Sequence, residues 1–336
     1  MQVKVKELQA GCILTEDIYG MTNRPIIPKQ TILTDELIAV LHAFLIPSVE
    51  VGNVLVNGEP FIQEGDTGQN DEEHDFTSAF LRAVQKSKGE FKLWQSGLPV
   101  DITRIRQILM PLLETMEENP DDIFLLHRLS NEEEYLYQHM VAVGLISAFI
   151  AARQNHSKGE TVQAALAGFL ADCGMSKVDP VILKKKSTLT AKEYEEIKFH
   201  ASYSYNMVKN NPFLNEGAKL AVIQHHERMD GSGYIFGLKG KKIHPTAKIV
   251  AVADTFHAMT SERLYRSKQS PFKVIELIKQ DYFGKFDLET VKSLEGGMIH
   301  LSQGSLVMLS NGETGKVLAV NKKHPARPLV KILKSG

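Results

Sequence analysis

Six side chains that can bind a metal ion lie in helical segments whose apolar spacing turns them toward the protein interior. His139, for example, lies three residues after Leu136 and four before Val143, on one helical face. A single inward histidine is usually a packed residue with a backbone partner, but a buried aspartate without a compensating cation is costly, and these faces offer no inward lysine or arginine. The six candidates together predict a metal centre: His139, Asp172, His200, His225, His226 and Asp254.

The ligand types restrict which metal is expected. Neutral imidazoles together with carboxylates suit first-row transition metals in octahedral geometry, so we expect one or two divalent ions, Fe or Mn. A tetrahedral zinc-thiolate site is not expected, because only Cys173 is near the candidates. The other cysteine is Cys12, and two cysteines in 336 residues indicate free thiols in a reducing cytosol rather than a disulfide framework.

The bulk composition argues against several classes of partner. The formal net charge is -1, so no global field draws the protein to DNA or to anionic lipid, and an anionic ligand must be held by local donors. The longest apolar run, residues 140–152, is interrupted by Gly144 and Ser147 and is too short to cross a bilayer of about 30 Å. The first residues form no apolar signal segment. We therefore expect a cytoplasmic protein without a membrane anchor.

The pattern along the chain predicts a mainly α protein in four parts. Residues 1–57 resemble a small α/β module with a strand at its start and a helix after Thr34, and a regulatory role is the candidate function of this module. Residues 58–75 are rich in glycine and acidic residues and predict a flexible linker. Residues 76–300 predict a helical bundle, and residues 301–336 change to a period of two, which predicts a short β hairpin or sheet turning at Asn311-Gly312.

Apolar spacing and capping signals set the expected helices of the bundle. Thr190 with Glu193 three residues later forms a capping-box pattern, and Pro111 is expected to kink the helix that contains it. The predicted helices span 76–87, 101–118, 131–154, 160–172, 191–210, 215–228, 245–261, 271–281 and 287–296.

Several ordered motifs resemble one known family. The run HHERMDGSGYIFGLKG at 225–240 resembles the HD-GYP family, in which a His-His pair, an acidic-Gly loop and a Gly-Tyr-Pro tripeptide follow one another. The runs at 247–266 and 181–200 and the lone His139 match the same family, so the resemblance covers about residues 124–320. It implies an HD-type helical domain that uses two or three metals to hydrolyse cyclic di-GMP, a bacterial signalling nucleotide.

The resemblance also implies a role for each matching residue. His200, His225 and His226 would hold one metal, and His139 and Asp254 would hold the other, with Asp172 bridging the two. Asp172 and Asp254 would then be the catalytic carboxylates that help hold an attacking hydroxide between the metals.

The substrate contacts come from two further motifs. Arg263 and Arg266, three apart on one helical face, match the family's phosphate-binding pair. Gly233 and Tyr234 match the first two residues of its tripeptide and would shape the ligand loop.

The sequence departs from the family at five positions. The His of the His-Asp pair is Ala171, the lysine three residues after Asp172 is Met175, and its acidic partner is His257. The tripeptide ends in Ile235 instead of proline, and Tyr135 replaces a glutamate that supports a third metal in some members.

Two of these changes have possible substitutes in this chain. His257 lies one helical turn after Asp254 and is a candidate replacement for the metal ligand lost at Ala171; the alternative is that it only packs there. Lys177 is a candidate substitute for the lost lysine, with a solvated loop lysine as the alternative.

Two functions from different classes follow. The first is a metal-dependent cyclic di-GMP phosphodiesterase, a phosphoric diester hydrolase with reduced activity. The second is a catalytically inactive signalling module that binds a cyclic dinucleotide or metal. A purely structural role is disfavoured, because six candidate ligands are present. A homodimer is compatible with either function.

Overall fold

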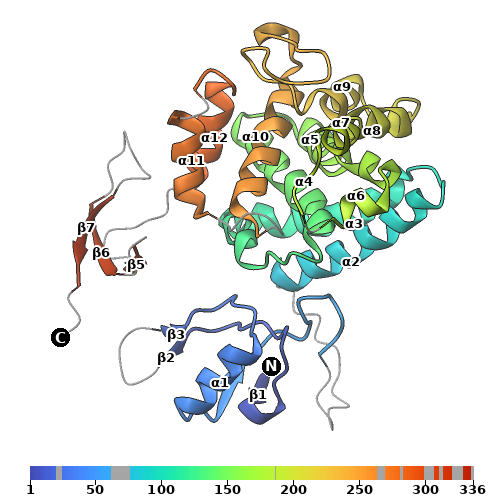
Figure 1. The fold of residues 1–336 in the computed structure, drawn as a ribbon. Helices are drawn as coiled ribbons and strands as arrows, with labels where there is room; N and C mark the ends of the chain where they lie inside the picture. The colour runs from blue at the N-terminus through green and yellow to red at the C-terminus, as the bar shows by residue number, and fades with distance from the viewer. Residues whose placement is uncertain are drawn as a thin grey trace.

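The computed structural model describes most of the chain, with gaps at its loops and ends. The described residues are 1–19, 25–61, 76–185, 187–262, 269–280, 283–298, 306–309, 313–319 and 328–333. Figure 1 shows one large group of helices, with a smaller unit of strands and one helix at the N-terminal end and a small sheet at the C-terminal end. This agrees with the predicted fold class, a mainly α protein with small β-containing parts at its ends.

The N-terminal unit contains short antiparallel pairs and one helix. Its elements are β1 (Gln2–Lys4), η1 (Val5–Glu7), β2 (Ile18–Tyr19), β3 (Pro25–Ile27), α1 (Asp35–Ala43) and β4 (Ser48–Glu50). β1 pairs with β4, and β2 pairs with β3. The Thr34 side chain accepts a hydrogen bond from the Leu37 amide and caps α1, as the sequence predicts. The unit has its own apolar core, but Ile13 and Val54 belong to the core of the helical domain and so join the two.

The predicted linker falls mostly outside the described residues. Residues 62–75 are not described, while residues 58–61 still belong to the N-terminal unit. There the amide of Phe61 donates to the carbonyl of Asn53, which returns the chain onto the unit. The linker therefore stays a prediction over 62–75.

The helical domain has a helix in every segment where the sequence predicts one, but α2 ends eight residues later than predicted and the segment 191–210 forms two helices. Its α-helices are α2 (Phe76–Gln95), α3 (Ile102–Glu118), α4 (Tyr135–Arg153), α5 (Lys158–Leu170), α6 (Pro180–Leu183), α7 (Ala191–Lys198), α8 (His200–Val208), α9 (Glu216–Gln224), α10 (Pro245–Thr260), α11 (Pro271–Gln280) and α12 (Leu288–Gly297). Its 3-10 turns are η2 (Pro120–Arg128), η3 (Cys173–Lys177) and η4 (Gly240–Lys242).

Two features of this domain differ from the prediction. The expected helix 191–210 is broken at Phe199 into α7 and α8, and the capping box of Thr190 and Glu193 starts α7. The turn η2 and the short helix α6 were not predicted, because neither is long enough to show an apolar period. Pro111 lies inside α3.

Helix α4 is the centre of the domain. It packs most extensively against α5 and also against α10 (Figure 1). Gly168 of α5 permits this close approach, since a Cβ there would lie 2.6 Å from the carbonyl oxygen of Val143. By length and hydropathy α4 could cross a membrane, but 78% of its most apolar window is buried inside the protein, as in a core helix.

The C-terminal sheet has three antiparallel strands. Its order is β5 (Leu306–Met308), β6 (Thr314–Ala319) and β7 (Leu329–Ile332). Met308 pairs with Thr314, so β5 and β6 form the predicted hairpin, although its turn at Asn311-Gly312 lies outside the described residues.

Candidate metal centre

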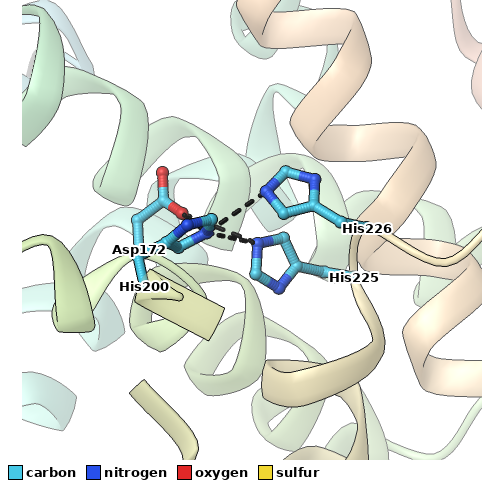
Figure 2. A group of neighbouring side chains, drawn as sticks. All are labelled: Asp172, His200, His225 and His226. Carbon is cyan, nitrogen blue, oxygen red and sulfur yellow. Dashed lines mark hydrogen bonds and ion pairs between the residues drawn. The ribbon is translucent and has the colours of Figure 1, made fainter. Parts of the chain in front are cut away.

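Five α-helices and their ends bring the six predicted ligands to one place inside the helical domain. Asp172 follows α5 and is the N-cap of η3, His200 begins α8, and His225 and His226 follow α9. His139 lies within α4 and Asp254 within α10. Figure 2 shows Asp172, His200, His225 and His226 pointing toward one another. We refer to these four residues as the histidine cluster.

Backbone carbonyls fix the tautomers of two cluster histidines. Nδ1 of His200 lies 2.6 Å from the carbonyl oxygen of Ile197, and Nδ1 of His225 lies 2.8 Å from that of Val222. A carbonyl can only accept, so each Nδ1 carries a proton and donates it. In the neutral rings each Nε2 is therefore left with a lone pair.

The three Nε2 atoms of the cluster converge. That of His200 lies 3.1 Å from Nε2 of His225 and 3.2 Å from Nε2 of His226. Two neutral acceptors cannot hydrogen-bond to each other, and the lone pairs of His200 and His225 converge on a position that fits a shared cation, either a metal ion or a proton on His200. Burial lowers the pKa of His200, but Asp172 raises it above its usual value. Figure 2 shows these contacts as dashed lines.

The carboxylate of Asp172 completes the cluster. Its Oδ1 lies 3.1 Å from Nε2 of His200 and 3.6 Å from Nε2 of His225. This buried oxygen lies close to His200 but lacks the angular geometry of a hydrogen bond to any described residue. One ligand atom from each of the four residues lies within 4.8 Å of the others. An orphaned carboxylate oxygen facing imidazole lone pairs fits a divalent metal ion.

A second set of contacts adjoins the cluster through the other oxygen of Asp172. Oδ2 lies 3.5 Å from Nε2 of His139, which lies 3.0 Å from Oδ1 of Asp254. The other oxygen of Asp254 lies 3.7 Å from Nδ1 of His226. The two oxygens of Asp172 thus face two groups of ligands, as a bridging role requires.

The electrostatics keep the two carboxylates ionised. Burial opposes ionisation of Asp172, but the imidazoles of His200 and His225 hold its pKa well below its usual value. Burial likewise opposes ionisation of Asp254, while its contact with His139 lowers its pKa. Burial is the main cause that lowers the pKa of His226, and the neighbouring His225 lowers it further. The low pKa favours the neutral form of His226, which can bind a metal.

Close packing of η3 on α8 sets the distance between Asp172 and His200. The amide of Gly174 donates to Oγ of Ser204 at 2.7 Å, and that hydroxyl donates to the carbonyl oxygen of Ala171 at 2.7 Å. A Cβ at Gly174 would lie 2.2 Å from the carbonyl oxygen of His200, so only glycine fits there. Sequence reasoning did not assign Ser204 or Gly174 a role, since each acts only through contacts between distant segments.

The loop after His226 forms one wall of the centre. The ring of Tyr234 stacks on His226 with centroids 4.6 Å apart, and burial raises the pKa of its phenol. Gly233 is required for this approach, because a Cβ would lie 2.4 Å from the carbonyl oxygen of His226. The predicted ligand-loop residues therefore lie beside the cluster.

Glu227 holds this loop and was missed by the sequence reasoning. Its buried carboxylate accepts hydrogen bonds from the amides of Phe236 at 2.7 Å and Leu238 at 2.8 Å. The position of a glutamate directly after the His-His pair was the available signal, but its partners lie nine and eleven residues further along.

The departures from the family pattern have clear places in the structure. Ala171 is buried beside Asp172 and offers no ligand atom, and Met175 packs against the helical core. Nζ of Lys177 donates a hydrogen bond to the carbonyl oxygen of Trp94 in α2. This contact does not favour Lys177 as the substitute for the lysine lost at Met175. Arg263 and Arg266 lie outside the described residues.

The ring nitrogens of His257 contact His139 and Ser261. Its Nδ1 lies 2.8 Å from Nδ1 of His139, and its Nε2 lies 3.1 Å from Oγ of Ser261. Both of its ring nitrogens thus have partners, which favours the alternative that His257 packs there over a role as a replacement metal ligand.

The comparison with known families agrees with this fold and this set of ligands. The family described as "HD domain" matches residues 125–289, which include all six predicted ligands. Residues 125–289 of this chain are thus similar to an HD domain. A second family, described as "KOW domain associated with HD domain", matches residues 306–335 and gives an identity to the C-terminal sheet that the sequence reasoning lacked.

Curated proteins similar to this chain include named phosphodiesterases. A cyclic di-GMP phosphodiesterase of Pseudomonas aeruginosa is 28% identical over 73% of this chain and 59% of its own length. A cyclic di-GMP phosphodiesterase of Thermotoga maritima is 30% identical over 66% of this chain and 58% of its own length. The chain thus spans somewhat less than two thirds of the length of these curated relatives.

A solved structure supports the same fold. An HDG"Y"P protein from Bdellovibrio bacteriovorus matches with a TM-score of 0.54 at 13% identity, over 88% of this chain and 98% of that one. Together with the HD-domain match and the named relatives, this confirms the predicted resemblance to the HD-GYP family.

Proposed function

We propose that this chain is a metal-dependent phosphodiesterase that hydrolyses cyclic di-GMP at a reduced rate. The observation that carries the proposal is the convergence of three imidazole Nε2 atoms on the orphaned Oδ1 of Asp172. The substrate follows from the names of the relatives from P. aeruginosa and T. maritima. Other cyclic dinucleotides share the same diester chemistry and belong in the same assay.

The residues of the centre divide into two ligand sets. His200, His225 and His226 would hold one divalent ion, and His139 with Asp254 would hold a second, with Asp172 shared between them. We propose Fe or Mn, because imidazole and carboxylate together suit those ions. When bound, such an ion supplies Lewis-acid stabilisation of a phosphoryl oxygen and lowers the pKa of water.

The protein's own groups would orient the reactants. Asp172 and Asp254 are buried and their pKa values are lowered, so both carboxylates are ionised acceptors for the attacking water. Tyr234, stacked on His226, would border the bound nucleotide. Arg263 and Arg266 remain the proposed phosphate-binding pair.

The reduced rate follows from the residues that replace the family's lysine and histidine, Met175 and Ala171. Met175 cannot transfer a proton or attract a phosphate, and its neighbour Lys177 is engaged by Trp94. Loss of one positioned proton-handling group typically costs ~10²–10⁴ in rate. Ala171 removes one imidazole from the second ligand set, which weakens the hold on that ion.

A second candidate is a catalytically inactive signalling module that binds the nucleotide or the metal. It is favoured by Met175 in place of the family's lysine, because the loss of a proton-handling group affects turnover more than binding. In either case we propose a cytoplasmic protein that acts on nucleotide rather than on DNA or a membrane, and a homodimer is compatible with it.

Turnover of cyclic di-GMP by the full chain loaded with Fe or Mn tests the proposal. We expect slow, metal-dependent release of the linear dinucleotide that is lost in His225→Ala. The matched control is His42→Ala, which removes an exposed histidine of the N-terminal unit. Metal and nucleotide binding without turnover would favour the inactive module, and turnover that persists in His225→Ala would contradict the proposed centre.

A further inference from the structure

The two ring nitrogens of His139 face different surroundings. Nε2 lies 3.0 Å from Oδ1 of Asp254, within the second ligand set. Nδ1 faces away from it and lies 2.8 Å from Nδ1 of His257 and 3.3 Å from the hydroxyl oxygen of Tyr135. His139 and His257 are both buried, so no bulk water competes for these contacts.

A histidine that binds metal through Nε2 must carry its proton on Nδ1 and needs an acceptor there. His200 and His225 use the carbonyls of Ile197 and Val222, which lie in the last turns of α7 and α9. His139 lies within α4, where the carbonyls of the preceding turn take part in helical hydrogen bonds. Its acceptor must therefore come from another side chain.

His257 is held in place to be that acceptor. Its Nε2 lies 3.1 Å from Oγ of Ser261, the residue that ends α10 and whose amide donates to the carbonyl oxygen of His257. With its proton on Nε2 facing this hydroxyl, its Nδ1 presents a lone pair to His139. The ring of Tyr135 stacks on His139 and His257, with centroid distances of 5.3 and 6.3 Å, and restrains both rings.

We propose that His257 is a positioning residue: it accepts the Nδ1 proton of His139 and so fixes the tautomer and orientation that turn Nε2 toward Asp172 and Asp254. This deepens the proposed function, because it rests on His139 being a metal ligand. In this role His257 binds no metal itself, and it does more than fill space in the core. The role is usually filled by a carboxylate, a carbonyl or water, and here a neutral imidazole fills it.

Three substitutions at one position separate the hydrogen bond from packing. His257→Gln keeps an oxygen that can accept from His139, His257→Leu keeps bulk without an acceptor, and His257→Ala removes both. The readout is the Mn²⁺ affinity of the full chain, measured by equilibrium dialysis against a chelator, with the thermal melt of the metal-free protein as a folding control. His42→Leu is the matched surface control.

We expect His257→Leu and His257→Ala to weaken Mn²⁺ binding by about 10- to 100-fold, and His257→Gln to stay within a few-fold of the parent chain. In a His139→Ala background, His257→Leu should weaken binding no further, because it acts through His139. Parental affinity in the leucine variant, or equal losses in the leucine and glutamine variants, would overturn the positioning role.

The same measurement separates this inference from the proposed function. If the parent chain binds no divalent metal, the proposed centre itself fails, and the positioning role fails with it. If the parent binds Mn²⁺ and His139→Ala leaves the affinity unchanged, the second ligand set fails together with the positioning role. If His139→Ala weakens binding but the His257 variants do not follow the expected order, only the positioning role fails.

Discussion

Nε2 of His200 lies 3.1 Å from Nε2 of His225, while Nδ1 of each ring donates to a backbone carbonyl. The carbonyls belong to Ile197 and Val222, each three residues before its histidine near the end of a helix. The same helix ends that position the rings also direct their lone pairs at each other. Neutral rings in this arrangement fit a cation between them, and a divalent metal ion would fill that position.

Removing the metal is expected to destabilise the folded protein. The ligands come from separate helices, so an ion that binds only the native state adds about 2.7 kcal/mol at a free concentration 100 times its Kd. The measurement is a thermal melt of the full chain with Mn²⁺ and with excess chelator. The chelator should lower the melting temperature less in His200→Ala than in the parent chain, and a chelator effect of the same size in both proteins would contradict the assignment.

Restoring two family residues together is expected to raise activity. In Ala171→His with Met175→Lys, the histidine would return a ligand beside Asp172 and the lysine would return a group near the reacting phosphate. We expect a gain of ~10²-fold or more in kcat for cyclic di-GMP, based on the usual contribution of one proton-handling group. The single Met175→Lys variant is the control that separates the effect of the lysine from that of the restored histidine. No gain in the double variant would place the catalytic defect elsewhere.

Glu227→Gln is expected to loosen the loop that carries Tyr234. The carboxylate accepts two amide hydrogen bonds, from Phe236 and Leu238, and a glutamine offers only one oxygen for them. We expect a loss of about 1–3 kcal/mol in stability and a rise in KM for the nucleotide, with metal affinity unchanged. An unchanged KM together with parental stability would show that the loop does not depend on this carboxylate.

The thiol of Cys173 reports on the packing of η3 against α8. Burial raises its pKa to about 12, with its contact to Ser204 acting in the opposite direction. We expect it to resist iodoacetamide from pH 7 to pH 10 in the folded protein and to react only at the rate of unfolding. The measurement is mass spectrometry of labelled peptides over time. Rapid labelling at pH 8 in native conditions would mean that η3 does not pack as described.

The sequence was sufficient for the main helices and for the meeting of the six ligands. His139 and Asp254 lie in long apolar helices that are buried on nearly every face, so the apolar composition of these segments alone places both side chains in the interior. The break at Phe199 was not predictable in the same way. The apolar spacing continues through it, and the break becomes apparent only in the structure, where the Phe199 amide donates within the last turn of α7.

Side-chain direction was the other limit. One turn of helix places His257 on the same face as Asp254, but the spacing cannot tell whether its nitrogens face the metal position or the far side of His139. The role of Glu227 depended on how the loop returns at Phe236, which its length alone does not determine. The identity of the C-terminal sheet came from its family match, since three short strands carry little pattern.

The most direct test is the metal content of the purified chain, measured by elemental analysis after loading with Mn²⁺ and gel filtration. We predict at least one equivalent per chain in the parent protein and in His42→Ala, and a loss of most of it in His200→Ala. Less than a tenth of an equivalent in the parent, or full retention in His200→Ala, would contradict the metal centre.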